Sequence, residues 1–354
     1  MKTFNNLFDK VTDFNNLFAA YRAARKGKKY DSEILPFEFY AEENLLKLKE
    51  QLEKQTYRHG GYREFIVNDS KKRRIQAAPF RDRVVHHALC NIIEPLFEQT
   101  FIFDSYACRK EKGTHKAVKR LKVFLRSFAF AERERERERE RKNTGCRIYC
   151  LQCDISKYFD SINHRILFEI LQRKIADEKV LRLIKEILDS NNAVTGKGIP
   201  IGNLTSQLFA NVYLNELDRF VKRVLKRRYY IRYMDDFLIF GESKQELWQV
   251  KEAIAEFLKT KLDLNLYPRK AVVFQASRGI EFLGYKVFAE YRTLKRGTVK
   301  RIIKKLKNYK RKIRTGDVKP EKLPLAVESW KAYARFANSW HTIHRFSKIT
   351  IPKS

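Results

Sequence analysis

The sequence predicts an α+β fold, and three patterns carry this prediction. An apolar strand at 147–152 precedes a helix at 163–174, whose apolar residues recur at helical spacing. Two aromatic, apolar runs at 229–232 and 237–240 flank a short turn and form a hairpin. Apolar and basic residues alternate at helical spacing near the end of the chain. The hydrophobic content of 44% is enough for a real core.

The hairpin turn holds two adjacent acids, in Tyr233-Met234-Asp235-Asp236. Two neighbouring carboxylates repel each other unless a divalent cation neutralises them. Hard oxygen ligands on a tight turn suit Mg²⁺, which keeps coordination positions open for substrate phosphates. The alternative is a solvated Asp-Asp turn, because such turns are common in hairpins.

A second acidic motif follows the strand at 147–152 and contains Asp154 and Asp160. Acids at two strand ends can converge on two metal ions, one activating an attacking hydroxyl and one stabilising the leaving oxygen of a phosphoryl displacement. This arrangement fits nucleotidyl transfer. The alternative is that the two acids cap the start of a helix, which suits Asp160 better than Asp154.

Over residues 60 to 290 the chain resembles the reverse transcriptase family, because several of its motifs occur in the family's order. The matching segments are Asp154-x4-Phe159, 198–207, the Tyr-x-Asp-Asp turn, 264–270 and 281–285. The resemblance implies a right-hand polymerase that makes DNA on an RNA template. Its expected parts are an N-terminal helical extension (1–59), fingers (60–145), a palm with a split βαβ, ferredoxin-like core (146–290) and a basic helical thumb (291–354).

The resemblance also assigns the chemistry. It makes Asp154, Asp235 and Asp236 the metal-binding and catalytic carboxylates, with Ile155 beside them in a site for two Mg²⁺ ions, for which Mn²⁺ would substitute. Lys270 occupies the position of a lysine that protonates or holds the departing pyrophosphate. The alternative for Lys270 is a surface lysine that follows a strand.

Other residues are implied to contact the incoming dNTP or the nucleic acid. Phe159 lies under the sugar, where a bulky ring excludes a 2′-hydroxyl. Arginines bind phosphate bidentately and stack on flat surfaces, which suits Arg83 over the base and Arg81 near the triphosphate; a solvated basic turn is the alternative. The implied set also includes Ile201, Gly202 and Gln207 for the nucleotide, and Tyr233, Met234 and Gly284 for the primer and template.

The nearest group within the family is that of diversity-generating retroelements. Most relatives, including group II intron and retron enzymes, carry Gln-Gly-x3-Ser-Pro, whereas this chain has Ile201 in place of Gln and Gln207 in place of Pro. Members of the group copy a template RNA with errors opposite adenine, and a pentameric accessory variability protein is the implied partner. Group II intron-like, retron and defence-associated enzymes remain alternatives. Thr205 or Ser206 is also a good N-cap for the helix that follows.

The charge of the chain predicts a polyanionic partner, here template RNA and the RNA/cDNA duplex. The chain has 75 Lys and Arg against 42 Asp and Glu, a net charge of +33, and residues 295–354 hold 18 of these cations against 3 acids. A helix there would present its cations on one face to a phosphate backbone. The predicted contacts are Lys300, Arg301, Lys304, Lys305 and Lys307. Aromatic residues at helical spacing predict the inner face of the thumb, namely Trp330, Tyr333, Phe336 and Trp340.

The location expected is cytoplasmic, with no membrane contact. No apolar segment approaches the roughly 20 residues that span a bilayer, and the first residues lack the apolar core of a signal peptide. The 5 cysteines are too few and too irregularly spaced for a disulfide framework, so we expect buried thiols.

Several elements are predicted from local pattern alone. Residues 4–18 predict one opening helix, 42–54 a second helix, and 62–67 with 74–78 a basic hairpin. His86 and His87 are placed at the start of a helix that packs inward. The alternating Glu and Arg of 132–141 bury nothing in either helix or strand, which predicts a solvated insertion.

Two other functional classes remain open. An RNA-dependent RNA polymerase would use the same acids, but Phe159 argues against it. A non-catalytic RNA-binding scaffold would explain the charge, yet it would have no use for three placed carboxylates.

Overall fold

The computed structural model describes residues 3–28, 32–68, 72–138, 148–191, 196–340 and 344. Its contacts divide the chain into two compact units. Unit 1 comprises Met1–Arg109, Gln152–Phe237 and Gln249–Val272, and unit 2 comprises Lys110–Leu151, Leu238–Trp248 and Val273–Ser354. These units do not follow the four predicted segments, whose boundaries stay a prediction.

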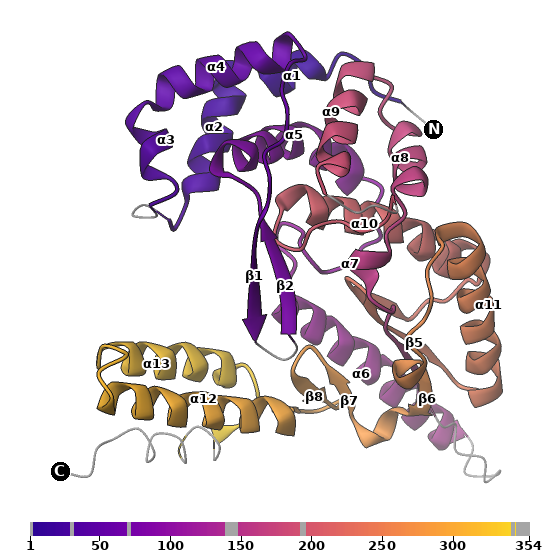
Figure 1. The fold of residues 1–354 in the computed structure, drawn as a ribbon. Coiled ribbons are helices and arrows are strands. Elements are labelled where there is room, and N and C mark those ends of the chain that lie inside the picture. The colour runs from indigo at the N-terminus through magenta and orange to yellow at the C-terminus, as the bar shows by residue number, and fades with distance from the viewer. Residues whose placement is uncertain are drawn as a thin grey trace. The chain divides into compact units, whose positions relative to one another are not determined.

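Unit 1 begins with helices α1 (Phe8–Thr12), α2 (Phe14–Arg25), α3 (Leu35–Phe39) and α4 (Ala41–Glu53) (Figure 1). The prediction of one opening helix was wrong, because Asp13 ends α1 and caps α2 by accepting the backbone N–H groups of Asn15 and Asn16. The prediction of a helix over 42–54 is confirmed by α4.

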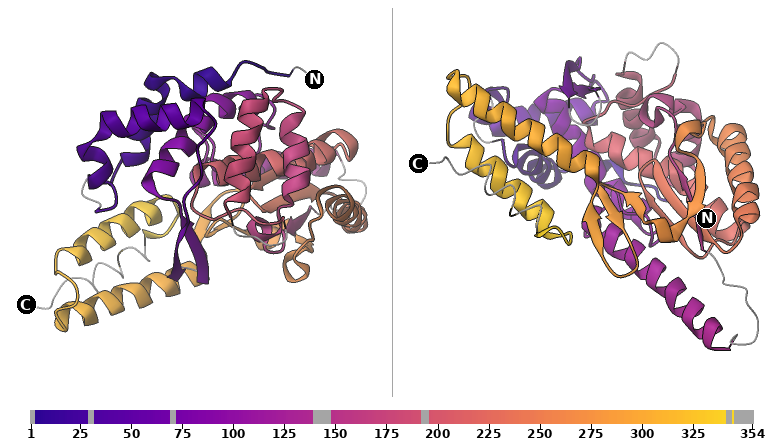
Figure 2. Two further views of the ribbon diagram at one scale, coloured as in Figure 1. Left: turned by 45° about the horizontal axis from the view of Figure 1, so that its top comes forward. Right: turned by 90° about the horizontal axis from the view of Figure 1, so that it is seen from below.

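The predicted basic hairpin is confirmed as β1 (Arg63–Asn68) and β2 (Lys72–Ala77), paired antiparallel from Arg63↔Ala77 to Asn68↔Lys72. It projects from the helices of unit 1 (Figures 1 and 2). Phe65, Ile66 and Val67 are exposed on it, so packing within the described residues does not account for their apolar side chains.

Helix α5 (Phe80–Glu98) follows the hairpin and packs against α2. It begins at Phe80, directly after Pro79, so the placement of His86 and His87 at a helix start was wrong by about two turns. Proline restricts the residue before it to extended backbone but is well suited to the position before a helix, which explains the earlier start. His86 does pack inward and is 1% exposed.

The strand–helix part of the predicted core is confirmed. Strand β3 (Tyr149–Cys153) leads through the short helix α7 (Tyr158–Ser161) to α8 (His164–Gln172), and α9 (Glu178–Asp189) lies beside α8 (Figure 2). Asp177 caps α9 and also accepts the backbone N–H groups of Leu7 and Phe8 at the start of α1, at 2.7 and 2.9 Å. One buried carboxylate thus holds the N-terminal segment against this region.

Helix α10 (Leu204–Arg219) continues into a π-helical turn (Phe220–Val224). The N-cap prediction was wrong: Asn203 occupies that position, while Thr205 and Ser206 are buried inside the first turn. The apolar face predicted for this helix is buried, including Leu208, Phe209 and Val212.

The predicted acidic hairpin is confirmed as β4 (Tyr230–Tyr233) and β5 (Asp236–Gly241), joined by Met234 and Asp235. These strands belong to a sheet with the order β4-β5-β3-β6, in which β6 is Val272–Gln275. Helix α11 (Lys244–Leu262) follows β5, and a single 3₁₀ turn (Pro268–Lys270) precedes β6.

Unit 2 contains helix α6 (Thr114–Glu138), a sheet of β7 (Ile280–Phe282), β8 (Tyr285–Val287) and β9 (Arg292–Leu294), and helices α12 (Arg296–Arg314) and α13 (Lys322–Arg335). A short 3₁₀ turn (Ala276–Arg278) precedes β7. Helices α12 and α13 run side by side (Figures 1 and 2). Trp330 is 3% exposed, but Trp340 is 68% exposed, so its placement on the inner face was wrong: it follows the end of α13 and does not continue its helical face.

Two remaining expectations concern the Glu/Arg repeat and the cysteines. The first part of the repeat, 132–138, is the end of helix α6, and 139–141 lie outside the described residues. Cys90, Cys150 and Cys153 are buried free thiols, whereas Cys108 is exposed, which corrects the expectation for that residue; Cys146 lies outside the described residues. In the described part of the chain, no helix combines the length and apolar character needed to cross a membrane.

Candidate active site

The two acids of the hairpin turn lie beside the end of strand β3. The sheet places β5 next to β3, so Asp236, the first residue of β5, comes close to the segment that ends in Asp154. Gln152 Nε2 donates to Asp236 Oδ1 at 3.5 Å. Residues about 80 positions apart in the sequence, Asp154 and the Asp235–Asp236 pair, are thereby brought into one site.

Each carboxylate of this site makes the ionised form of its neighbours less favourable. Burial raises the pKa of Asp236 to about 7, and the charges of Asp154 and Asp235 add to this effect. Burial and the charge of Asp154 likewise raise the pKa of Asp235, while Lys270 and Arg73 lower it. A site with this much unfavourable negative charge gains stability from a bound cation.

The side chain of Lys270 lies next to the carboxylate of Asp154. Backbone pairing brings the two together: Tyr267 N donates to Asp154 O at 2.7 Å, and Ile155 pairs with Leu266. The Lys270 ammonium forms an ion pair with Asp154 Oδ2. Burial opposes the charged form of Lys270, but the hydrogen bond and charge of Asp154 outweigh it and raise the pKa of Lys270.

The donor set fits a hard divalent cation, because it consists of carboxylate oxygens. In the described ranges, however, no three His, Cys, Asp or Glu side chains are grouped closely enough to hold a metal ion. Lys270 neutralises Asp154 here, so its ammonium competes with any cation for that carboxylate.

Three of the residues predicted to contact the nucleotide line one small pocket. Arg83, Gly202 and Gln207 surround a volume of about 180 Å³ together with Lys28 and His87. No sequence pattern indicated Lys28, which comes from the N-terminal segment. Its lining includes the cations Lys28 and Arg83 and the histidines His86 and His87, and cations of this kind bind anionic groups.

Ile201 precedes Gly202 in the chain but does not line that pocket. Ile201 lines a different, polar pocket of about 590 Å³ that also includes Asp160 and Tyr62. Its carbonyl accepts the backbone N–H of Gln76 in β2 at 3.1 Å. Gly202 has a φ of +129°, and a Cβ there would meet Gln76 O at 3.3 Å, so the close approach of this loop to the hairpin favours glycine.

Phe159 lies in α7, directly after the segment that carries Asp154. Its side chain is half-buried, and its carbonyl accepts the backbone N–H of Ile199 at 2.9 Å. This bond ties the start of the 198–207 motif to the predicted sugar site. The role of Phe159 under the sugar stays a prediction.

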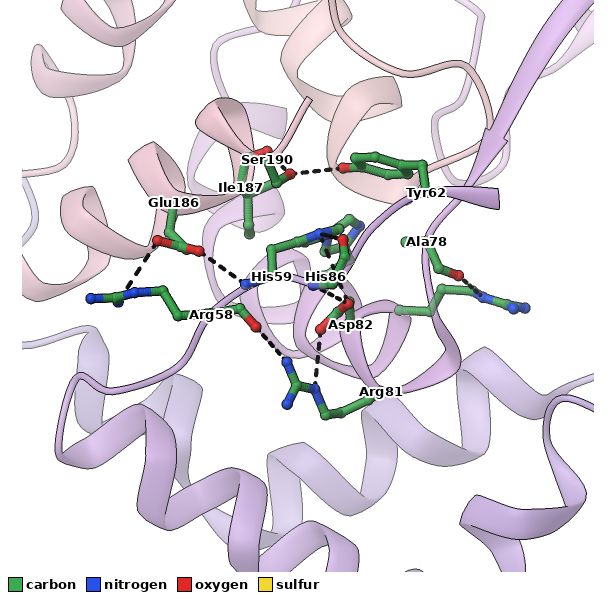
Figure 3. Close-up of polar contacts among 12 residues, drawn as sticks. Arg58, His59, Tyr62, Ala78, Arg81, Asp82, His86, Glu186, Ile187 and Ser190 are labelled. Atoms are coloured by element: carbon green, nitrogen blue, oxygen red, sulfur yellow. Dashed lines mark hydrogen bonds and ion pairs between the residues drawn. The ribbon is translucent and has the colours of Figure 1, made fainter. Parts of the chain in front are cut away.

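Arg81 and Arg83 both have protein partners. Arg81 donates to Asp82 and to the carbonyl of Arg58, as Figure 3 shows. Arg83 Nε donates to Ala78 O at 2.8 Å, and its Nη2 lies 2.6 Å from Glu33 Oε2. Arg83 still lines the 180 Å³ pocket, whereas Arg81 lies over the ring of Tyr57. Triphosphate contact by Arg81 therefore requires the exchange of these partners.

A pair of histidines, His59 and His86, lies close to Arg81 and Asp82 (Figure 3). The Nε2 atoms of His59 and His86 are 3.2 Å apart, so one of them donates to the other. Asp82, also fully buried, accepts the Tyr57 hydroxyl and the Gly60 N–H, both at 2.8 Å. Burial, followed by the nearby His59 and His87, lowers the pKa of His86 to about 3.

Because His86 is neutral in the folded protein, the free energy of unfolding should decrease as the pH falls. An unfolded histidine takes up a proton below its usual pKa of about 6.5, while folded His86 does not until about pH 3. The contribution of His86 to the free energy of unfolding is therefore fully present above pH 6.5. It is lost as the pH falls, by about 1.3 kcal/mol between pH 7 and 5.5. Urea unfolding at both pH values should show this loss in the wild type and a correspondingly smaller loss in His86→Gln; equal losses in the two proteins would contradict it.

In unit 2, the predicted nucleic-acid contacts form a basic helix and a tight turn. Lys300, Arg301, Lys304, Lys305 and Lys307 are all exposed on α12, whereas Leu306 is buried, which confirms the predicted cationic face. Gly284 lies in the turn between β7 and β8 with a φ of +89°, and a Cβ there would collide with the Tyr333 hydroxyl. The positive φ favours glycine at this turn, because side chains rarely adopt that backbone conformation.

Tyr233 is half-buried, and Met234 is 8% exposed with a left-handed φ of +55°. Two functional candidates were missed from the sequence. Arg73 in β2 lies near enough to lower the pKa of Asp235, and only the fold could bring it there. Arg232 is fully buried next to the turn. A charged residue in an apolar strand, two residues before Met234, could have indicated a buried polar contact.

The chain is similar to known proteins in sequence and in fold. The sequence model of the family described as reverse transcriptase (RNA-dependent DNA polymerase) matches residues 64–287. The chain is 26% identical to the Group II intron-encoded protein LtrA of Lactococcus lactis subsp. cremoris over 81% of this chain and 55% of that protein. It is 26% identical to Protein YkfC of Escherichia coli over 64% of this chain and 66% of that protein. The chain thus spans about half the length of the first relative.

Among solved structures, apo telomerase from Candida tropicalis is similar with a TM-score of 0.50 and 11% identity, over 68% of this chain and 50% of that chain. At that identity the likeness shows the fold alone. Together with the mixed helices and sheets described above, it confirms the predicted α+β right-hand polymerase fold.

Proposed function

Because the chain belongs to the reverse transcriptase (RNA-dependent DNA polymerase) family, we propose that it synthesises DNA on an RNA template by nucleotidyl transfer. The observation that carries this proposal is the convergence of Asp154 with Asp235 and Asp236, beside Lys270. Nothing in a purely RNA-binding scaffold would require three carboxylates to share a site at the cost of their charge repulsion.

Asp154, Asp235 and Asp236, with the backbone at Ile155, would hold two Mg²⁺ ions, with Mn²⁺ as a substitute. Bound divalent cations neutralise developing charge and activate an attacking hydroxyl. Lys270 then holds or protonates the departing pyrophosphate once it is released from Asp154. Arg83, Gly202 and Gln207 bind the incoming nucleotide, and Lys28 contributes a further cation to the same pocket.

Primer extension by the purified chain tests this proposal. An RNA template with a DNA primer should be extended with dNTPs and Mg²⁺, and EDTA should stop the reaction. Extension with NTPs in preference to dNTPs would favour an RNA polymerase, and tight RNA binding without extension would favour a scaffold. Phe159 supports the choice of dNTPs, because a ring under the sugar leaves no room for a 2′-hydroxyl.

We further propose that the enzyme belongs to the diversity-generating branch. Ile201 and Gln207 support this branch, since most other relatives carry Gln and Pro at these positions. A group II intron-type enzyme is the second candidate, and the similarity to LtrA over 81% of the chain favours it. On the first proposal, the partner is a pentameric accessory variability protein, and the location is cytoplasmic. Co-purification from cells tests the partner, and cell fractionation tests the location.

Ile201→Gln should lower misincorporation opposite template adenine more than opposite other bases. Isoleucine holds the incoming nucleotide by shape alone, whereas a polar side chain penalises a misplaced substrate by leaving a hydrogen bond unmade. Sequencing cDNA made by both proteins on one template measures the change. Ile201→Leu is the matched apolar control and should keep the wild-type error pattern. Equal adenine error rates in wild type and Ile201→Gln would contradict the role of Ile201.

A further inference from the structure

A fully buried arginine lies directly beneath the acidic turn of unit 1. Arg232 is in strand β4, two residues before Met234, and has no exposed surface. Its Nε donates to Asp218 Oδ1 at 2.7 Å and its Nη2 to Asp218 Oδ2 at 2.6 Å, which is a bidentate ion pair. Its Nη1 donates to Met234 O at 3.1 Å and to Asn211 Oδ1 at 3.3 Å.

Packing alone does not explain this pair. Removing two charges from water is costly, and apolar residues of similar volume often stabilise a core as well as a buried ion pair does. An apolar residue at this position could not donate a hydrogen bond to Met234 O, as Arg232 does. Asp218, which also accepts the Tyr230 hydroxyl at 2.7 Å, holds the guanidinium in the orientation that this donor requires.

The Met234 carbonyl is part of the peptide group that also contains the backbone nitrogen of Asp235. A peptide group is planar, so fixing its oxygen fixes the direction in which the chain enters Asp235. Met234 has a φ of +55°, which is unfavourable for a residue other than glycine and persists only where surrounding contacts hold it. The bond from Arg232 is such a contact.

The backbone N–H and C=O groups of Arg232 are both hydrogen-bonded. Arg232 N donates to Asp104 O at 2.9 Å, and Arg232 O accepts the Tyr106 N–H at 3.0 Å. Asn211 Nδ2 donates to Ala107 O at 2.8 Å, which joins α10 to the same segment. The guanidinium therefore has little freedom to move, as a group that sets another group's geometry requires.

We propose that Arg232 is a positioning residue, which holds the Met234 carbonyl and thereby orients Asp235 for divalent-cation binding. This inference rests on the proposed nucleotidyl transfer. It assigns Asp218 the role of fixing the guanidinium, and it explains why a charged residue is buried beneath a turn that carries charged ligands.

Two variants separate positioning from a purely structural role. Arg232→Lys keeps a cation opposite Asp218, but a single ammonium cannot make the bidentate pair and also reach Met234 O. The triple variant Asp218→Leu, Tyr230→Phe, Arg232→Met removes the whole polar group and leaves an apolar core. Tyr213→Phe is the matched control, because it removes another buried hydrogen bond of α10, from Tyr213 to Leu262 O at 2.6 Å, away from the turn.

Each protein is measured for Mg²⁺-dependent extension per folded molecule, RNA affinity, and the rise in Tm that Mg²⁺ causes without substrate. In Arg232→Lys and the triple variant, the Mg²⁺ concentration for half-maximal extension should rise, and extension should fall, each by roughly 10- to 100-fold. RNA affinity should be unchanged. The Mg²⁺-induced rise in Tm should be reduced in both and kept in Tyr213→Phe.

Wild-type Mg²⁺ dependence and a wild-type rise in Tm in Arg232→Lys would overturn the proposal. If the triple variant fails to fold, the results for Arg232→Lys alone decide whether Arg232 is a positioning residue. A wild-type chain that extends no primer would overturn the proposed function instead, and the Mg²⁺-induced rise in Tm would then decide the role of Arg232.

Discussion

Replacing Asp154 or Asp235 with Asn should abolish primer extension. Asp154 directly follows β3, and Asp235 lies in the turn between β4 and β5. The two carboxylates share one charged site, so each variant removes a ligand that the other carboxylate cannot replace. A metal ion supplies several kcal/mol of transition-state stabilisation, so the expected loss is roughly 10³-fold or more. Single-nucleotide extension on a primed RNA template, with Mg²⁺ in excess, measures it. Asp236→Asn should lose less.

Binding provides the internal control for this prediction. RNA affinity and Tm should be largely retained in Asp154→Asn and Asp235→Asn, because neither side chain is required to hold the backbone. Asp9→Asn removes the same charge from an exposed position on α1 and should extend primers normally. A purified Asp154→Asn protein that extends primers at the wild-type rate would contradict the assignment of Asp154 as a metal-binding carboxylate.

Neutralising the exposed cations of α12 should weaken RNA binding and flatten its dependence on salt. Each phosphate contact releases condensed counterions, so replacing Lys300, Lys304, Lys305 and Lys307 by Gln should reduce the slope of log affinity against log salt by about 3 to 4. At 50 mM salt the same loss appears as a large drop in affinity. Fluorescence anisotropy with a labelled RNA over a series of salt concentrations measures both.

The effect should be the same for RNAs of different sequence, since phosphates carry no sequence information. Four exposed cations of the N-terminal helices provide the matched control, namely Lys10, Arg22, Lys26 and Lys47. Their replacement changes the net charge by the same amount and should leave the slope nearly unchanged. If both sets flatten the slope equally, net charge rather than the α12 surface governs binding.

Elements were predictable wherever local pattern was strong. Alternation and turn residues predicted β1–β2 and β4–β5 within one or two residues, and helical spacing predicted α4, α8 and the cationic face of α12. These patterns act over a few neighbouring residues, so the sequence contains them in full. The α1–α2 break at Asp13 was missed because a capping carboxylate interrupts an otherwise continuous apolar pattern.

The acids of the site were predictable one by one, but their surroundings were not. Asp154, Asp235, Asp236 and Lys270 were found from motif order, and the fold brought them together. The ion pair between Lys270 and Asp154 depends on the pairing of 154–156 with 265–267. The placement of Arg83 with Lys28 depends equally on how the N-terminal helices pack.

The sequence by itself determined the α+β class, the acidic hairpin, the strand that ends in Asp154 and the basic surface of α12, because each follows from residue type at short spacing. Only the tertiary structure decided that Asn203 occupies the N-cap position of α10, that Trp340 is exposed and that Arg232 donates to Met234 O. Those outcomes depend on which of several available partners each group meets. Contacts between residues far apart in the sequence are selected by the packing of the whole unit, since a cap, a buried charge or an exposed ring is stabilised only by its final neighbours.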